Sequence, residues 1–463
     1  MDFKHMMERD TIAAIATGLV PSGIGIIRVS GPDAIRIVDG IFTGADLSEA
    51  STHTIHYGMI SLHGELIDEV LVALMRSPRS YTKEDTVEID CHGSPLVMQK
   101  VLEAVCHAGA RLAEPGEFTK RAFFNGRMDL SEAESVIDLI YSKTDYARKS
   151  ALSILRGSMK EKISELRKRL LHRTAYIEAA LDDPEHYDLS GFTEELRRDV
   201  LQVEDEIDRI LQTSENGRLL AEGIRTVILG KPNVGKSSLL NCLLGEDRAI
   251  VTEIAGTTRD TLEEQALLDG ILLKIIDTAG IQDTMDPVEK IGVKKAVDSL
   301  SDADLILFVV DGSKPLTEED HQIAGLLGPK TVLGLLNKSD LPAVVSKEMM
   351  EEQLSLSGIP ILSISSKMGQ GLDQLKTTIS NVFFQGNISF NDELIVTNVR
   401  QKESLRKTKE SLSRVLESIE AGMPEDFYSV DLMDAYGELG RIIGEKVEED
   451  LVNEIFAEFC MGK

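Results

Sequence analysis

Tryptophan does not occur in this chain of 463 residues, cysteine occurs four times, and aromatic side chains make up only 5% of the residues. The cysteines, Cys91, Cys106, Cys242 and Cys460, are scattered, with no C-x-x-C pair and no histidine at ligand spacing. This pattern argues against a disulfide framework and against a structural zinc site. We expect reduced thiols, buried in the first three cases.

Long apolar runs are also missing, since no stretch reaches the roughly 18 apolar residues that a membrane-spanning helix needs. The first residues, MDFKHMMERDTIAAIATG, do not form a basic-then-apolar leader. A cytoplasmic protein that does not enter a membrane is therefore expected. With 42% hydrophobic and 28% charged residues, the composition is that of a globular chain of two to four domains.

Positive charge is scarce, because 50 Lys and Arg stand against 78 Asp and Glu and give a formal net charge of −28. So acidic a surface repels nucleic acid as a whole, and nucleic-acid binding would need a local basic patch or a partner protein. The best local candidate is KEKISELRKRLLHR at residues 160–173. A solvated helix face explains that stretch equally well.

The chain shows three kinds of sequence pattern, which divide it into parts. Residues 1–127 mix short β-type runs with Gly and Pro, which predicts an α+β domain. Residues 128–222 and 384–463 carry apolar residues at helical spacing. Residues 223–383 alternate strand-like and helix-like segments, as in a parallel sheet with crossover helices. We interpret the chain as a multidomain α/β and α protein, in which the α/β domain is inserted into a helical domain made from two chain segments.

Within the inserted domain, strands are predicted at 226–229, 305–310, 332–336 and 361–364. A hairpin is predicted where Asp269-Gly270 separates two apolar-rich runs. After residue 390, helical spacing ends on Phe456 and Phe459, which predicts that the last segment is packed.

The segment GKPNVGKS at residues 230–237 fits GxxxxGK[ST] and lies between a predicted strand and a predicted helix, the context of a phosphate-binding P-loop. Glycines let backbone N–H groups converge on phosphates, and the helix N-terminus adds a favourable dipole. Lys236 is expected at the β- and γ-phosphate oxygens, and Ser237 at Mg²⁺.

Four further segments follow the P-loop in the order expected of a GTP site: a switch threonine pair, a DTAG segment for Mg²⁺ and the γ-phosphate, an NKSD segment, and an SSK segment on the base side. In NKSD, Asp340 can accept from guanine N1–H and the N2 amino group together, a donor pair that adenine lacks. A GTP site in a Ras-like parallel sheet is therefore predicted. The predicted GTP-binding residues are Asn233, Val234, Gly235, Lys236, Ser237, Ser238, Thr252, Thr257, Thr258, Asp277, Gly280, Asn337, Lys338, Asp340, Ser365, Ser366 and Lys367.

The residue after DTAG is Ile281, where Ras-like enzymes place a water-positioning Gln. Its side chain cannot hydrogen-bond to water, so a nearby acid must serve, and we favour Glu289 over Asp283 and Asp286. Asn233 and carbonyls of the following switch loop could hold a monovalent cation that adds positive charge beside the phosphates. The alternative for Asn233 is a simple loop-capping amide.

With these residues placed, the chain resembles the tRNA-modification GTPases of the MnmE (TrmE) type along nearly its whole length. The resemblance rests on GIIRVSG at 25–31, PGEFTKRAFFNGRMDLSEAE at 115–134, PNVGKSS and GTTRD in the inserted domain, and the final CMGK. It implies a homodimer formed through the N-terminal domain, whose G domains pair across the dimer when potassium and GTP bind. It also implies a flavin-containing partner protein, which would make a heterotetramer. With that partner, such GTPases add a carboxymethylaminomethyl or aminomethyl group at C5 of the wobble uridine of certain tRNAs.

The resemblance further implies which residues bind each ligand. A tetrahydrofolate one-carbon derivative (5-formyl or 5,10-methylene) would bind at Arg28, Glu88, Arg127 and Lys463. Potassium would bind at Asn233, Thr252, Ile254 and Thr257, and Mg²⁺ at Ser237 and Thr258. The catalytic residues would be Glu289, Lys236 and Cys460. Arg127 stands where the family usually has lysine, and Met461 where it usually has isoleucine.

Three further alternatives stay open. Arg28 and Glu88 are either folate contacts or ordinary surface or strand-edge charges. Cys460 is either a catalytic thiol or a close-packed small residue. The whole chain is either a modification enzyme or a ribosome-assembly or signalling GTPase, which would bind RNA or protein by switch motion and carry out no modification. A folate site would favour the enzyme, since a pure switch has no use for one.

Overall fold

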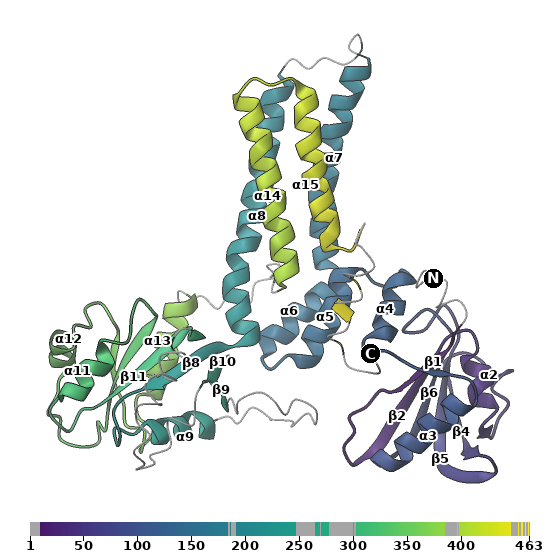
Figure 1. Cartoon of the computed structure of the whole chain (residues 1–463), viewed down its shortest axis with the longest axis horizontal. Coiled ribbons are helices and arrows are strands. Elements are labelled where there is room, and N and C mark those ends of the chain that lie inside the picture. Colours follow the sequence, from purple (N-terminus) through teal and green to yellow (C-terminus); the bar gives the residue numbers. More distant parts are fainter. Residues whose placement is uncertain are drawn as a thin grey trace. The chain divides into compact units, whose positions relative to one another are not determined.

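The computed structural model describes residues 10–183, 186, 191–246, 264–268, 270–276, 300, 302–384, 396, 398–445, 452, 455, 456, 459 and 462. The chain forms two compact units (Figure 1). One comprises Met1–Ile140, Ala151–Glu204 and Glu403–Lys463, and the other comprises Tyr141–Ser150 and Asp205–Lys402. Among the described residues, no helix is long and apolar enough to cross a membrane.

The first unit begins with a seven-stranded sheet of order β3-β4-β5-β6-β2-β1-β7, antiparallel except for the β1–β7 pair. Helices α2 and α3 pack their apolar side chains against one face of this sheet, which makes that face the core of the domain. The elements are β1 Ile12–Ile15, β2 Ser22–Ser30, α2 Ala34–Asp39, β3 Phe42–Thr43, β4 Thr54–Leu62, β5 Glu65–Met75, β6 Thr86–Gly93, α3 Pro95–His107 and β7 Arg111–Leu112. The predicted α+β fold of this part is confirmed.

The helices of the first unit come from both sides of the inserted domain. They are α4 Glu117–Phe124, α5 Leu130–Tyr141, α6 Asp145–Leu155, α7 Ser158–Asp182, α8 Phe192–Glu222, α14 Val399–Glu420 and α15 Glu425–Ile442, of which α5, α6, α8 and α14 include residues of the second unit. In the bundle of Figure 1, the guanidinium carbon of Arg167 in α7 lies 4.1 Å from the ring centre of Tyr436 in α15, and the Ser413 hydroxyl of α14 donates to Glu204 of α8 at 2.8 Å. Both contacts join the segment before the inserted domain to the segment after it. The prediction of one helical domain built from two chain segments is confirmed.

The second unit contains a six-stranded sheet of order β13-β12-β11-β8-β10-β9, in which only the β9–β10 pair is antiparallel. Its elements are β8 Ile224–Leu229, α9 Lys236–Glu246, β9 Glu264–Leu268, β10 Ile271–Ile275, β11 Leu305–Asp311, α11 Glu318–Ala324, β12 Val332–Asn337, α12 Lys347–Gln353, β13 Ile361–Ser363 and α13 Leu372–Phe384. All four predicted strands and the predicted hairpin are present.

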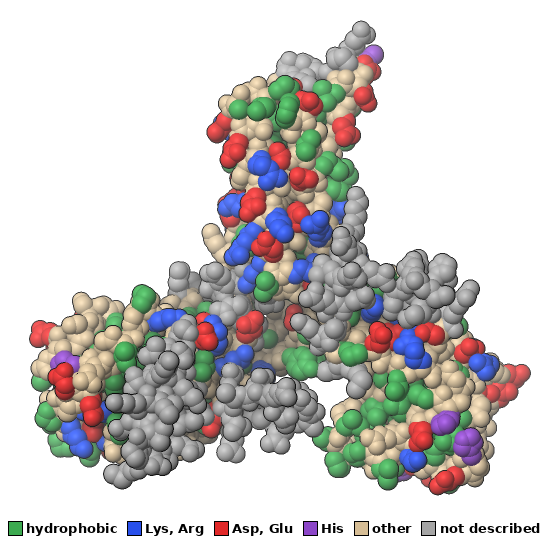
Figure 2. Space-filling view, viewed as in Figure 1, with side chains coloured by type: hydrophobic (Ala, Val, Ile, Leu, Met, Phe, Trp, Pro, Cys, Tyr) green, Lys and Arg blue, Asp and Glu red, His purple; other side chains and the backbone are tan. Residues whose placement is uncertain are grey.

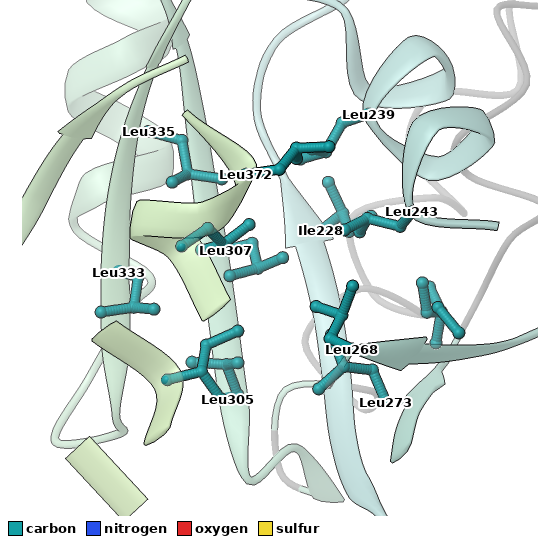
Figure 3. Packing of buried hydrophobic residues seen from close by; sticks show 14 of the residues in the cluster. Ile228, Leu239, Leu243, Leu268, Leu273, Leu305, Leu307, Leu333, Leu335 and Leu372 are labelled. Carbon is teal, nitrogen blue, oxygen red and sulfur yellow. The ribbon is translucent and has the colours of Figure 1, made fainter. Parts of the chain in front are cut away.

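Apolar clusters cover both faces of this sheet, which is why its central strands are continuously apolar. On one face, shown in Figure 3, Leu239 and Leu243 of α9 and Leu372 of α13 pack against the strands. Each fully buried leucine contributes about 1.5–3 kcal/mol. This packing fixes the edge of the sheet at which the P-loop begins.

Candidate functional site

The P-loop joins β8 to α9, and its backbone takes conformations that restrict its sequence. Gly230, Asn233 and Gly235 have φ angles of 155°, 64° and 101°. A Cβ atom on Gly230 would overlap the carbonyl oxygen of Val309, and one on Gly235 would overlap the side-chain amide of Asn337. The two glycines are therefore required both by backbone conformation and by the close approach of neighbouring chain segments.

The P-loop lysine lies across the start of its own loop. Lys236 Nζ donates to the carbonyl oxygens of Gly230 and Lys231 at 2.8 and 3.0 Å. Ser237 and Ser238 lie in the first turn of α9, where backbone N–H groups and the helix dipole favour an anion. The arrangement suits phosphate binding.

The NKSD segment contacts the P-loop directly. The buried Asn337 donates from Nδ2 to the carbonyl of Val234 at 2.7 Å and accepts from the backbone N–H and hydroxyl of Ser366 at 3.0 and 2.9 Å. Lys338 Nζ donates to the carbonyl of Asn233 at 2.8 Å. One buried amide thus joins three segments that are far apart in the sequence.

Asp340 is exposed next to this junction, and its Oδ1 accepts from the Ser365 hydroxyl at 2.6 Å. This hydrogen bond lowers the pKa of the Asp340 carboxyl, with smaller help from Lys367 and Lys338. The carboxylate is therefore held ionised and oriented, as an acceptor for the guanine N–H groups must be.

The structure thus brings together the predicted nucleotide residues 233–238, 337, 338, 340 and 365–367 at the carboxyl edge of the sheet, where ligands bind in open α/β sheets. Other predicted residues lie outside the described part of the chain. They are Thr252, Ile254, Thr257, Thr258, Asp277, Gly280 and Glu289 of the second unit, and Cys460 and Lys463 of the first.

Sequence reasoning missed the acid that completes this site. Asp311, at the end of β11, is 3% exposed, and its Oδ2 accepts from Lys338 Nζ at 2.7 Å. Its Oδ1 accepts from the backbone N–H and hydroxyl of Ser313 at 3.0 and 2.6 Å. Burial alone would raise the pKa of Asp311, but Lys338 and Ser313 hold it below its usual value. An acid directly after the apolar run LILFVV was the available signal.

A second missed contact ties the P-loop to α11. Lys231 Nζ lies 2.6 Å from Oδ2 of the fully buried Asp320 and 3.1 Å from the Thr317 hydroxyl. The same Asp320 oxygen accepts from the Thr317 backbone N–H at 2.8 Å, which caps α11. One carboxylate therefore holds both the helix start and the P-loop.

A second polar cluster lies in the first unit. Arg28 of β2 and Glu88 of β6 are directly opposite in the sheet register and form an ion pair with Nε and Oε1 2.8 Å apart. Arg28 also donates to the carbonyl of Gly462 at 3.0 Å. The guanidinium carbons of Arg28 and Arg127 lie 5.4 and 4.5 Å from the ring centre of Tyr81. Two predicted folate residues, Arg28 and Arg127, thus lie beside Tyr81, which the sequence did not point to, and a third, Glu88, is held by Arg28.

The described residues of the last segment are packed, as predicted. Phe456 and Phe459 are buried in an apolar cluster with residues of α4 and α5. Gly462 has a φ of 95°, and a Cβ on it would overlap the carbonyl of Ile15. The cysteine prediction is only partly right, because Cys91 is buried whereas Cys106 and Cys242 are half-buried.

A phosphate loop between a strand and a helix, joined to an NKSD loop at the carboxyl edge of a parallel sheet, defines a P-loop GTPase. Comparison with known proteins narrows this class. Residues 130–460 match the family model of the MnmE helical domain, and residues 11–127 match that of the GTP-binding protein TrmE N-terminus. The chain belongs to the MnmE family of tRNA modification GTPases, and it is a GTPase.

Two relatives of the same description match this chain over nearly their full length. The tRNA modification GTPase MnmE of Lachnoclostridium phytofermentans is 55% identical over 99% of this chain and 100% of that protein. The protein of the same description from Thermoanaerobacter pseudethanolicus is 47% identical over 98% of this chain and 99% of its own length. A solved structure of Aquifex aeolicus Era bound to GDP and AlF4⁻ covers 41% of this chain and 66% of its own at 30% identity, with a TM-score of 0.28.

Proposed function

We propose that this GTPase modifies C5 of the wobble uridine of certain tRNAs, by adding a carboxymethylaminomethyl or aminomethyl group. It would act with a flavin-containing partner protein and a folate-derived one-carbon donor. The observation that carries the proposal is a second polar cluster, Arg28, Glu88 and Arg127, in a chain that already has a nucleotide site. A GTPase that only switches between two states has no use for a folate site, so folate binding at this cluster would favour the enzyme.

The chemistry of this cluster fits a tetrahydrofolate derivative. The guanidinium groups of Arg28 and Arg127 suit the carboxylates of the glutamate tail, and the Glu88 carboxylate suits the N–H donors of the pterin. Tyr81, which is half-buried, supplies an aromatic face beside Arg28, with its ring centre 5.4 Å from the guanidinium carbon. The folate would supply the one-carbon unit, and these side chains would bind and orient it.

Cation binding at the nucleotide site is proposed on narrower grounds. Asn233 is exposed in a left-handed turn of the P-loop, and Ser237 lies in the first turn of α9. Their side-chain oxygens suit K⁺ and Mg²⁺ respectively. If Asn233 binds K⁺, wild-type turnover of GTP should be several-fold higher in KCl than in NaCl, and Asn233→Ala should abolish the difference. Equal wild-type rates in the two salts would contradict the potassium role.

A homodimer is proposed through the N-terminal sheet. The face of this sheet away from α2 and α3 carries the exposed side chains of Ile55, Tyr57 and Met59 on β4, and of Leu71, which is opposite Tyr57 on β5. Neighbouring exposed apolar side chains of this kind mark interaction surfaces. A second copy of the chain would cover them.

The deciding experiment is nucleoside analysis of tRNA from cells that lack this protein. We expect the C5 modification of the wobble uridine to disappear and to return with the wild-type gene but not with Arg28→Ala. An unchanged wobble uridine would contradict the enzyme proposal. Calorimetric titration with 5-formyl-tetrahydrofolate adds an independent test, in which absent binding would favour the alternative of a switch GTPase.

A further inference from the structure

Two successive carbonyl groups of the P-loop are held by the NKSD segment. The carbonyl of Asn233 accepts from Lys338 Nζ at 2.8 Å, and the carbonyl of Val234 accepts from Asn337 Nδ2 at 2.7 Å. Both contacts join the base side of the nucleotide site to its phosphate side. They fix the orientation of two adjoining peptide planes.

The orientation of these planes determines where the following N–H groups point. In a trans peptide the C=O of one residue and the N–H of the next point in opposite directions. Because the carbonyls of Asn233 and Val234 point toward the NKSD segment, the amide N–H groups of Val234 and Gly235 point away from it. Backbone N–H groups turned to the inside of a P-loop are the groups that bind phosphate.

The carbonyl of Asn233 belongs to a residue in a less common backbone conformation. Asn233 has a φ of 64°, in the left-handed region, which asparagine adopts more readily than most residues other than glycine but less often than the right-handed region. A conformation of this kind persists where the surroundings determine it. Lys338 supplies such a constraint, provided that its long, flexible side chain is itself held in place.

Asp311 holds the Lys338 side chain in place. The carboxylate of Asp311 is 3% exposed, its Oδ2 lies 2.7 Å from Lys338 Nζ, and its Oδ1 accepts two hydrogen bonds from Ser313. The ammonium of Lys338 is thus fixed between a buried charge and the P-loop carbonyl. The chain of contacts runs from the end of β11 through Lys338 to the P-loop backbone.

We propose that Asp311 is a positioning residue for nucleotide binding, which acts through Lys338 to present the P-loop amides of Val234 and Gly235 to the phosphates. The inference rests on the nucleotide site proposed above and adds to it a residue that does not itself touch the nucleotide. Asp311 would set affinity for the phosphates and leave recognition of the base to Asp340.

The test is Asp311→Asn in the full chain, with GDP, GTP and inosine triphosphate as ligands. Asparagine keeps the shape and can still accept from Ser313, but it removes the charge that holds Lys338. We expect the Kd of GDP and GTP to rise about tenfold or more, the scale of one charge-assisted hydrogen bond. Because inosine lacks only the N2 amino group that Asp340 reads, the ratio of the Kd values of inosine triphosphate and GTP should stay at its wild-type value. The kcat at saturating GTP should stay within about twofold of wild type.

Asp304→Asn is the matched control. Asp304 directly precedes β11, at the opposite end of the strand, and pairs with Arg225 at 3.2 Å. Its loss also removes one ion pair of the same sheet, and nucleotide affinity should stay within twofold of wild type. Ser313→Ala is a milder variant, which removes one support of Asp311 and should weaken GDP binding a few-fold. It keeps the test valid if Asp311→Asn does not fold.

A double-mutant cycle with Lys338→Met completes the test. If Asp311 acts through Lys338, the double variant should bind GDP no more weakly than Lys338→Met alone. Additive losses, or wild-type affinity in Asp311→Asn, would overturn the inference. Absence of guanine-nucleotide binding by the wild-type chain would instead overturn the proposed nucleotide site.

Discussion

One hydrogen bond has the largest effect on how Asp340 titrates. The Ser365 hydroxyl is the largest cause of the lowered pKa of Asp340. A lowered pKa keeps the carboxylate ionised to lower pH, so guanine binding should persist further into the acid range than an unperturbed aspartate would allow. Protonation of Asp340 would abolish its role as a double acceptor.

Ser365→Ala should therefore move the acid limit of GDP binding to higher pH. Without the hydroxyl the pKa of Asp340 rises, and affinity is lost earlier as the pH falls from neutrality. Fluorescence titration with labelled GDP over a pH series measures this midpoint. Ser366→Ala is the control, because Ser366 bonds to Asn337. It should weaken binding at every pH without moving the midpoint, and a midpoint unchanged in Ser365→Ala would refute the assignment.

Gly462→Ala tests the docking of the last segment. Alanine at a φ of 95° is strained by about 1–2 kcal/mol, and its Cβ would also overlap the carbonyl of Ile15. We expect faster proteolysis of the segment and weaker folate binding, because Arg28 loses the Gly462 carbonyl. Gly422→Ala has a positive φ of 65° but open space around its Cβ, so it controls for strain alone. Equal behaviour of the two variants would mean that the overlap with Ile15 is relieved without undocking.

At the scale of elements, one carboxylate connects the P-loop to α11. Asp320→Ala would leave the Lys231 ammonium, 13% exposed, without its buried partner and would remove the cap of α11. Breaking a buried pair on one side costs about 3–5 kcal/mol. The Tm of the second unit should fall by several degrees, and the affinity for nucleotide should fall as well.

The control for this change is Asp373→Ala. Asp373 is almost fully exposed in the first turn of α13, and the shortest contact of its ion pair with Lys376 is 3.7 Å. Such a pair contributes about 0–1 kcal/mol. Similar losses of stability in the two variants would show that burial of Asp320 does not matter.

The elements and the local β9–β10 hairpin were largely predictable, whereas strand pairing between distant segments was not. Apolar runs such as 305–310 predicted β11, and Asp269-Gly270 predicted the β9–β10 hairpin, because local chemistry determines both. The contact between Arg28 and Glu88 depends on the β2–β6 register across 60 residues, which no local pattern contains. The position of Tyr81 beside Arg28 and Arg127 was equally unpredictable, because it too depends on contacts between distant parts of the chain. The sequence shows an acid at position 311 directly after an apolar run, but it does not show that this acid contacts Lys338.

At the scale of the whole molecule, the distribution of charged and exposed apolar side chains indicates which kinds of partner the surface can bind. The basic stretch 160–173 lies in α7, where Arg167 pairs with Glu445 and Arg173 with Asp199 and Glu195. Figure 2 shows Lys and Arg side chains interspersed with Asp and Glu along the bundle. These ion pairs favour the alternative of a solvated helix face over a basic patch.

The proposed dimer can be tested with a charge on the exposed sheet face. Tyr57→Asp faces Leu71 across the β4–β5 pair, so a dimer there would bury an unpaired carboxylate. Sedimentation velocity should show a monomer at concentrations where the wild-type chain is dimeric. Leu96→Asp, on α3 at a side chain of similar exposure, is the control and should remain dimeric. A dimeric Tyr57→Asp variant would move the interface elsewhere.

The hydrogen bond from Arg28 to the carbonyl of Gly462 spans 434 positions of the sequence. During synthesis, the strand that carries Arg28 emerges long before residue 462 exists. The second polar site can therefore be completed only after nearly the whole chain has been translated, whatever the N-terminal sheet does earlier. A truncated chain, or one cleaved by a protease before residue 462, would keep the residues of its nucleotide site. It would lose the Gly462 carbonyl that contacts Arg28 in the second polar cluster. If this cluster binds folate as proposed, a chain that lacks Gly462 should bind folate more weakly.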